Sequence, residues 1–174
     1  MRRLILLRHA KSSRPPGIED FERPLAAQGR EAAGRMGTYL REQDLSPDLA
    51  LVSPSRRTRE TWDLVRPALG EVETRFEQAI YEAPATRLLS AVRDAGPEAR
   101  SVLMIGHNPG FEDLARQLAG EGDPDELARL SEKFPTSAVV VIDFPVESWA
   151  EIEPRGGRLE RFVAPKDLGV EEDD

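Results

Sequence analysis

The eight residues Leu4-Ile5-Leu6-Leu7-Arg8-His9-Ala10-Lys11 decide the fold of this chain. Four apolar residues form an unbroken run that ends at a charged segment, which is typical of a short strand buried on both faces of a sheet. The same pattern recurs at residues 49–52, 102–105 and 138–142, and weaker strand patterns lie at residues 73–78 and 159–163. The sequence therefore predicts a sheet built largely from buried strands.

Segments with helical periodicity separate these strands, at residues 26–41, 57–69, 85–93 and 111–118. Strands that alternate with helices indicate a parallel sheet covered by helices on both faces. We predict an α/β fold, a three-layer α/β/α sandwich with a mostly parallel central sheet. A chain of 174 residues suits one domain better than two. We assign the domain to residues 1–165 and expect residues 166–174 to form an acidic, frayed C-terminal tail.

Composition and charge narrow the classes of function. The chain has no cysteine, which excludes thiolate nucleophiles and disulfides and favours a cytoplasmic location. The net charge of −8 argues against nucleic acid as a partner. No apolar stretch approaches the roughly 20 residues of a membrane span, so we expect no membrane partner. Basic residues nevertheless gather in the first third of the chain, and a local basic mouth suits a phosphorylated ligand.

Polar motifs follow three of the predicted strands directly. Arg8-His9 ends the first strand, Ser53-Pro54 with Arg57 follows the second, and Gly106-His107 follows the run at residues 102–105. In an open α/β sheet, ligands bind outside the carboxyl ends of the strands. The chain has two histidines, and each of them stands at such a strand end. We therefore expect these motifs to form one site.

The residue types in this site suit phosphoryl transfer. A histidine can attack phosphorus when its imidazole is neutral at one nitrogen and oriented by a hydrogen bond from the other. The phosphoryl oxygens then need fixed cations, and the planar fork of arginine binds them better than lysine does. We predict that His9 is the nucleophile and that Arg8, Arg57 and His107 are the cations.

The same residues resemble a known family. Arg8-His9-Ala10 is similar to the Arg-His-Gly signature of the histidine phosphatase superfamily, the phosphoglycerate-mutase-like fold, with Ala10 in place of glycine. Ser53-Pro54 with Arg57 and Thr61 resembles the second motif of that family, and Gly106-His107 resembles its distal histidine. Two further stretches, Arg8 to Ser13 and Asp20 to Gly29, look like the small SixA-type phosphohistidine phosphatases. The resemblance implies that His9 accepts the phosphoryl group and that Arg8, Arg57 and His107 form the phosphate pocket.

Four other side chains are further candidates for the site. Arg23 either lines the phosphate mouth, oriented by Asp20, or belongs to a helix entry with Pro24. Lys11 and Ser12 directly follow the nucleophile and are candidate substrate contacts. Superfamily members that cleave phosphate esters usually carry a carboxylic acid that protonates the leaving oxygen. Glu82 is the candidate here, and its alternative is an exposed loop carboxylate.

The favoured function is hydrolysis of phosphohistidine in a partner protein, without a metal or another cofactor. One alternative is a small-molecule phosphomonoesterase or a mutase-like phosphotransferase, although the segment at residues 68–84 is short for the insertion that a mutase needs. A second alternative is a non-catalytic phosphate-binding module, which the complete set of motif residues opposes. Two histidines without H-x-H or H-E-x-x-H spacing give a metal hydrolase little support.

Overall fold

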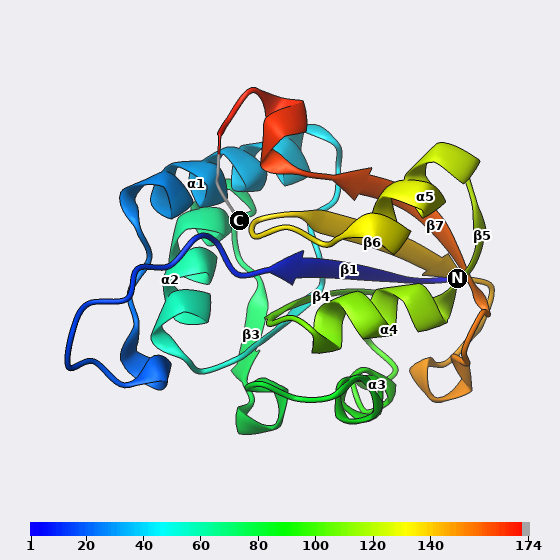
Figure 1. The fold of residues 1–174 in the computed structure, drawn as a ribbon. Helices are drawn as coiled ribbons and strands as arrows, with labels where there is room; N and C mark the ends of the chain where they lie inside the picture. The colour runs from blue at the N-terminus through cyan, green and yellow to red at the C-terminus, as the bar shows by residue number, and fades with distance from the viewer. Residues whose placement is uncertain (172–174) are drawn as a thin grey trace.

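A computed structural model describes residues 1–171 and contains a mixed sheet at its centre (Figure 1). Within the described residues this sheet has seven strands in the order β3-β2-β4-β1-β6-β7-β5. The strands are β1 (Arg2–Arg8), β2 (Leu49–Val52), β3 (Glu73–Phe76), β4 (Ser101–Gly106), β5 (Ala119–Gly122), β6 (Val139–Phe144) and β7 (Gly157–Val163). All six predicted strand segments are present, and the first of them, β1, lies in the middle of the sheet.

The strand directions confirm a mostly parallel sheet. The pairs β1–β4, β2–β4, β2–β3 and β5–β7 are parallel. Only β6, among the described strands, runs against its neighbours, because it pairs antiparallel with both β1 and β7. The apolar run at residues 138–142 could not reveal this reversal, since a fully buried strand has the same composition in either direction.

Helices cover both faces of the sheet (Figure 1). On one face, α1 (Ala27–Glu42) and α2 (Arg56–Val65) pack on a core that includes Ile5 and Leu7 of β1. On the other face, α3 (Ala85–Arg93), α4 (Gly110–Leu118) and α5 (Pro124–Glu132) pack on a core that includes Leu4 and Leu6. Side chains of one strand thus alternate between two cores, as the pleat requires. The predicted three-layer sandwich is confirmed.

The sequence prediction missed β5 and α5. Gly122-Asp123-Pro124 reads as a turn, but here it begins a helix. The Asp123 carboxylate accepts hydrogen bonds from the backbone amides of Asp125 and Glu126 at 2.9 and 3.2 Å, and Pro124 occupies the first helical turn. Aspartate at the N-cap followed by proline is a favoured helix start. The same residue types are also common in turns, so the sequence alone did not distinguish a turn from the start of a helix.

The helix predicted at residues 57–69 also differs at its end. α2 stops at Val65, and the chain continues as the 3₁₀ helix η2 (Arg66–Ala68). Pro67 lies in η2, where it has no amide hydrogen for an α-helical bond, although Arg66 before it keeps an α conformation. The 3₁₀ turn is therefore the local consequence of this proline.

The first residues of the predicted tail belong to a short helix. Residues Pro165–Leu168 form the 3₁₀ helix η5. An ion pair joins this helix to α5, with Arg129 Nη2 at 2.7 Å from Asp167 Oδ2. Most of the predicted tail follows η5, and its last three residues, 172–174, lie outside the described part of the chain. The boundary at residue 165 stays a prediction. No helix within residues 1–171 is long and apolar enough to cross a membrane.

Candidate active site

The sheet brings the three strand-end motifs together because β2, β4 and β1 are neighbours in it. The backbone amide of His9 donates to the Gly106 carbonyl, and that of Ser53 donates to the Ile105 carbonyl, each at 3.0 Å. The hydrogen-bond pattern of the sheet thus continues one residue into the motifs. Above this edge lies a pocket of about 300 Å³, and every predicted site residue lines it. These residues are Arg8, His9, Lys11, Ser12, Arg23, Arg57, Glu82 and His107.

His9 is buried and its ring is held in one tautomer. Its Nδ1 lies 2.8 Å from the Ala10 carbonyl oxygen, an acceptor, so Nδ1 carries the hydrogen and Nε2 keeps its lone pair. Burial, first, and then the nearby His107 and Arg57 hold the pKa of His9 well below its usual value of 6.5. The imidazole is therefore neutral at physiological pH, as a nucleophile requires.

Thr61 explains why the second motif ends in threonine. Its Oγ1 accepts a hydrogen bond from the Ala10 amide at 3.0 Å and donates one to the Arg57 carbonyl at 2.8 Å. One buried hydroxyl thus connects the backbone beside His9 to the first turn of α2. The nucleophile segment and the pocket arginine are fixed relative to each other.

His107 is also neutral, contrary to the expectation that it is a cation. Arg57 has no acceptor, so its Nη2 donates to His107 Nδ1 at 3.3 Å, and His107 Nε2 then donates to Ser53 Oγ at 2.8 Å. Burial and the charge of Arg57 lower the pKa of His107 to about 3. The sequence could not show this, because the protonation state follows from burial beside an arginine rather than from any motif. In this state His107 offers a neutral ring, 5.4 Å between centroids from His9.

Arg57 is 2% exposed and is held by the loop before α1. Its Nη1 donates to the backbone carbonyl of Asp20 at 2.8 Å, and its Nη2 donates to the Asp20 carboxylate at 3.0 Å. Its Nε is buried without a hydrogen-bond partner. An unsatisfied buried arginine nitrogen is costly, and an anion in the pocket would be a suitable acceptor for it.

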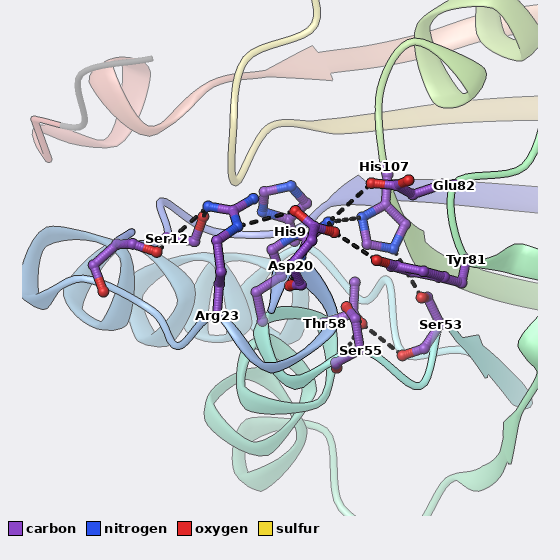
Figure 2. Close-up of polar contacts among 12 residues, drawn as sticks. His9, Ser12, Asp20, Arg23, Ser53, Ser55, Thr58, Tyr81, Glu82 and His107 are labelled. Atoms are coloured by element: carbon purple, nitrogen blue, oxygen red, sulfur yellow. Dashed lines mark hydrogen bonds and ion pairs between the residues drawn. The ribbon is translucent and has the colours of Figure 1, made fainter. Parts of the chain in front are cut away.

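Asp20, on the 3₁₀ helix η1 (Asp20–Glu22), connects several pocket side chains. Figure 2 shows its carboxylate between Arg23, whose Nε donates to Oδ1 at 3.0 Å, and Tyr81, whose hydroxyl donates to Oδ2 at 2.5 Å. Arg23 also donates to Ser12 Oγ at 2.7 Å. Together, Tyr81 and the two arginines keep the pKa of Asp20 well below its usual value against the opposing effect of burial, so the carboxylate is ionised.

The segment at residues 134–137 closes the remaining side of the pocket. Arg8 Nη1 and Asn108 Nδ2 both donate to the Phe134 carbonyl, at 3.0 and 2.9 Å. The Ser137 amide donates to the carbonyls of Arg8 and His9 at 3.1 and 3.2 Å. The guanidinium of Arg8 is thus oriented by this segment, while its backbone belongs to β1.

Glu82 differs from the residues at the bottom of the pocket. Its side chain is 57% exposed, and its Oε1 lies 3.6 Å from Arg57 Nη2. Its backbone φ of 48° lies in the left-handed region, which is uncommon for a residue other than glycine. Glu82 therefore reaches the pocket from a constrained loop position while remaining in contact with solvent.

Gly29 of α1 packs directly against the backbone of Lys11, two residues after His9. A Cβ atom at this position would lie 2.1 Å from the Lys11 carbonyl oxygen, which is far inside van der Waals contact. The same carbonyl accepts a hydrogen bond from the Ala26 amide at 2.8 Å. Only a residue without a side chain allows the helix to approach residues 11–13 this closely.

Tyr81 and Thr136 are two residues at or beside the site that the sequence did not indicate. Thr136 is 5% exposed, lines the pocket, and its hydroxyl has no hydrogen-bond partner. Neither residue belongs to a recognisable pattern. Thr136 lines the pocket itself, whereas Tyr81 contacts two pocket residues, Asp20 through its hydroxyl and His107 through its ring. Across residues 1–171, no group of three or more His, Cys, Asp or Glu side chains could hold a metal ion.

Comparisons with known proteins identify the family. The sequence profile described as histidine phosphatase superfamily (branch 1) matches residues 4–88. A solved structure from Agrobacterium tumefaciens, assigned as phosphohistidine phosphatase SixA, is 32% identical, covers 94% of this chain and 98% of its own, and superposes with a TM-score of 0.80. The chain belongs to the histidine phosphatase superfamily. This histidine phosphatase is also 34% identical, over 92% of its length, to the whole of the uncharacterized Mycobacterium tuberculosis protein Rv1276c.

A more distant structure supports the fold of this histidine phosphatase alone. The protein histidine phosphatase SixA in complex with tungstate is 22% identical, covers 95% of this chain and 99% of its own, and superposes with a TM-score of 0.77. The predicted phosphoglycerate-mutase-like architecture is confirmed by these neighbours. The superfamily and the SixA neighbour support phosphatase activity on a phosphorylated substrate.

Proposed function

We propose that this phosphatase hydrolyses phosphohistidine in proteins through a covalent phosphoryl intermediate on His9, without a metal. The observation that carries the proposal is the neutral His9 ring, whose Nδ1–H is bound to the Ala10 carbonyl so that Nε2 keeps its lone pair, in a pocket that Arg8 and Arg57 also line. A nucleophile fixed in the reactive tautomer beside two arginines is the arrangement that phosphoryl transfer needs.

The first chemical step is an in-line displacement. His9 Nε2 attacks phosphorus while the bond from phosphorus to the leaving group breaks on the opposite side. The guanidinium groups of Arg8 and Arg57 stabilise the three equatorial oxygens, and the phosphoryl dianion raises the affinity of His107 for a proton. His9 keeps its Nδ1 proton throughout, so phosphorylated His9 is an imidazolium whose N–H remains bonded to the Ala10 carbonyl.

The second step returns the enzyme to its resting state. Water attacks the phosphorus of phosphorylated His9, the P–N bond breaks, and its electron pair returns to Nε2. Both protons of the water remain on the released phosphate as dihydrogen phosphate. His9 is again neutral with hydrogen on Nδ1, and no metal or other co-reactant enters the balance.

The protonation states of Asp20 and Tyr81 support a phosphoramidate substrate. Asp20 is held ionised, and burial together with Asp20 raises the pKa of Tyr81 to about 12, so neither gives up a proton readily near pH 7. An imidazole leaves without a donor when its second ring nitrogen already carries a proton. An alkoxide has no such site and needs an acid.

Glu82 is the observation that favours a second candidate, a small-molecule phosphomonoesterase or mutase-like phosphotransferase. It lines the pocket at 3.6 Å from Arg57, where a carboxylic acid could protonate a leaving oxygen. The third candidate, a non-catalytic phosphate-binding module, is disfavoured because the proposed nucleophile is present and neutral.

A comparison of substrates tests the proposal. The purified protein is offered a phosphohistidine-bearing protein, p-nitrophenyl phosphate and an alkyl phosphate, each with and without a metal chelator. We expect the highest kcat/KM for phosphohistidine and no effect of the chelator. A higher kcat/KM for the esters would favour the phosphomonoesterase, and tight phosphate binding without turnover would favour the binding module. The cytoplasmic location and the protein partner stay predictions.

A further inference from the structure

The carboxylate of Asp20 lines the pocket in which we propose that phosphate binds. Asp20 lines the same pocket as His9, its side chain is 42% exposed, and it is ionised. A fixed negative charge beside a phosphoryl dianion weakens binding, so its position calls for a physical reason beyond phosphate recognition. Its contacts with Arg57 and Arg23 supply part of that reason, because they orient both guanidinium groups.

The carboxylate retains capacity for another hydrogen bond. An ionised carboxylate offers about four acceptor positions. Oδ1 accepts from Arg23 Nε, and Oδ2 accepts from Arg57 Nη2 and from the Tyr81 hydroxyl. Three positions are therefore used. The remaining one, on Oδ1, is available to a donor that enters the pocket.

The expected position of the leaving group is on the same side of the pocket as the Asp20 carboxylate. In an in-line displacement the leaving group lies on the side of phosphorus opposite the nucleophile. His9 is 7% exposed at the bottom of the pocket, so a group opposite it lies toward the solvent, where the exposed η1 helix carries Asp20. The ring of Tyr81 lies edge-on to Phe21 at 5.0 Å and to His107 at 5.4 Å between centroids, and its hydroxyl donates to the Asp20 carboxylate.

We propose that Asp20 is a specificity-determining residue that accepts a hydrogen bond from the ring N–H of a departing imidazole. The inference rests on the proposed function and adds to it the group that distinguishes a phosphorylated imidazole from a phosphate ester. The P–N electron pair goes to the leaving nitrogen, the proton stays on the other ring nitrogen, and the product is neutral imidazole.

In this proposal the ring of His9 and the ring of the substrate phosphohistidine each donate an N–H to a fixed oxygen acceptor of the protein. Phosphorylated His9 is an imidazolium whose Nδ1–H donates to the Ala10 carbonyl at 2.8 Å. A phosphohistidine substrate needs the same protonated ring nitrogen, and Asp20 supplies the acceptor from the opposite side of the phosphoryl group. A carboxylate also stabilises the positive charge of the imidazolium, which an ester lacks.

The experiment compares Asp20→Asn with wild type on N-phosphoimidazole and p-nitrophenyl phosphate, two small probes that exclude any effect of protein docking. We expect the ratio of their kcat/KM values to fall by about 10–100-fold toward the ester, the effect of one lost charge-assisted hydrogen bond. Glu22→Gln removes the same charge from the same 3₁₀ helix and is the matched control, because Glu22 does not line this pocket. Equal losses on both probes would reduce Asp20 to an anchor for the arginines and overturn the inference.

Two measurements do not depend on that single variant. Wild-type protein should prefer N-phosphoimidazole to its N-methyl derivative by a similar factor, because methylation removes the ring N–H and keeps the positive charge. In the pH profile of kcat, the basic limb for N-phosphoimidazole should move to lower pH in Asp20→Asn, since the carboxylate no longer stabilises the bound imidazolium. No preference for the N–H probe, or an unmoved limb, would contradict the inference.

These outcomes separate the inference from the proposed function. If wild-type protein prefers esters to both phosphohistidine and N-phosphoimidazole, the proposed function fails. If it hydrolyses phosphohistidine preferentially and Asp20→Asn keeps that preference, the proposed function stands and the role of Asp20 is wrong.

Discussion

At the floor of the pocket, the side chains of His9, Arg57 and His107 are each less than 10% exposed, and backbone carbonyls or buried hydroxyls fix them. At the mouth, Asp20 and Glu82 have side chains that are 42% and 57% exposed. The floor can recognise the phosphoryl group, which every substrate of the superfamily shares. The mouth meets the leaving group, which differs between substrates. Substitutions at the floor should therefore affect all substrates alike, and substitutions at the mouth should change the preference among them.

The largest effect is expected for the nucleophile. His9→Ala should lower kcat by on the order of 10⁴–10⁶, the loss typical of removing a nucleophile. Wild-type protein quenched after brief incubation with labelled substrate should carry acid-labile, base-stable phosphate, and the variant should carry none. Circular dichroism and thermal unfolding check that the variant is folded. Near-normal turnover in a folded His9→Ala protein would remove His9 from the mechanism.

Arg57→Ala and His107→Ala test whether the floor acts on the phosphoryl group alone. Each should lower kcat/KM by about 10²–10³, the usual loss for one electrostatic donor, which His107 becomes once the bound dianion has raised its affinity for a proton, and by a similar factor for esters and phosphoramidates. Arg56→Ala is the matched control, because Arg56 is the preceding residue of α2 and is exposed. Losses that depend strongly on the substrate would instead assign these residues to recognition of the leaving group.

The two neutral histidines should make stability depend on pH. Their pKa values are lowered in the folded protein, His107 to about 3, from 6.5. Below pH 6.5 the unfolded chain binds protons that the folded protein does not, so the free energy of unfolding should decrease as the pH falls. The slope is up to about 1.4 kcal/mol per pH unit for each histidine. Urea unfolding between pH 7 and pH 4.5 measures it.

Replacement of one histidine by asparagine provides the control for this slope. His107→Asn and His9→Asn should each remove about half of the pH dependence in that range. The ionised Asp20 does not interfere, because a carboxylate with a lowered pKa loses its stabilising contribution only below the usual value of 3.8. A wild-type free energy of unfolding that stays constant down to pH 4.5 would mean that both histidines are protonated normally.

The residues of the floor and of the mouth were largely predictable from the sequence, whereas several of the contacts that join them and the protonation state of His107 were not. Arg8, His9 and His107 follow apolar runs within one or two residues, so a local pattern places them at strand ends. The contact between Tyr81 and Asp20 joins residues 61 positions apart in the chain, and no periodicity encodes it. The neutrality of His107 was likewise hidden, because it depends on burial and on the orientation of Arg57.

The smallest effect, and the finest test of the mouth, is expected at Glu82. If Glu82 is an exposed carboxylate without a proton-transfer role, Glu82→Gln should change kcat/KM for p-nitrophenyl phosphate and for an alkyl phosphate by less than about threefold, the modest effect of one charge near an anionic substrate. If it is a general acid, the alkyl phosphate should lose about 10²–10⁴, while p-nitrophenyl phosphate, whose leaving group needs little protonation, should lose much less. We expect the first result, because an imidazole with a protonated ring nitrogen departs without an acid and the side chain is 57% exposed. A large loss confined to the poor leaving group would make this protein a phosphomonoesterase whose mouth selects through Glu82 rather than Asp20.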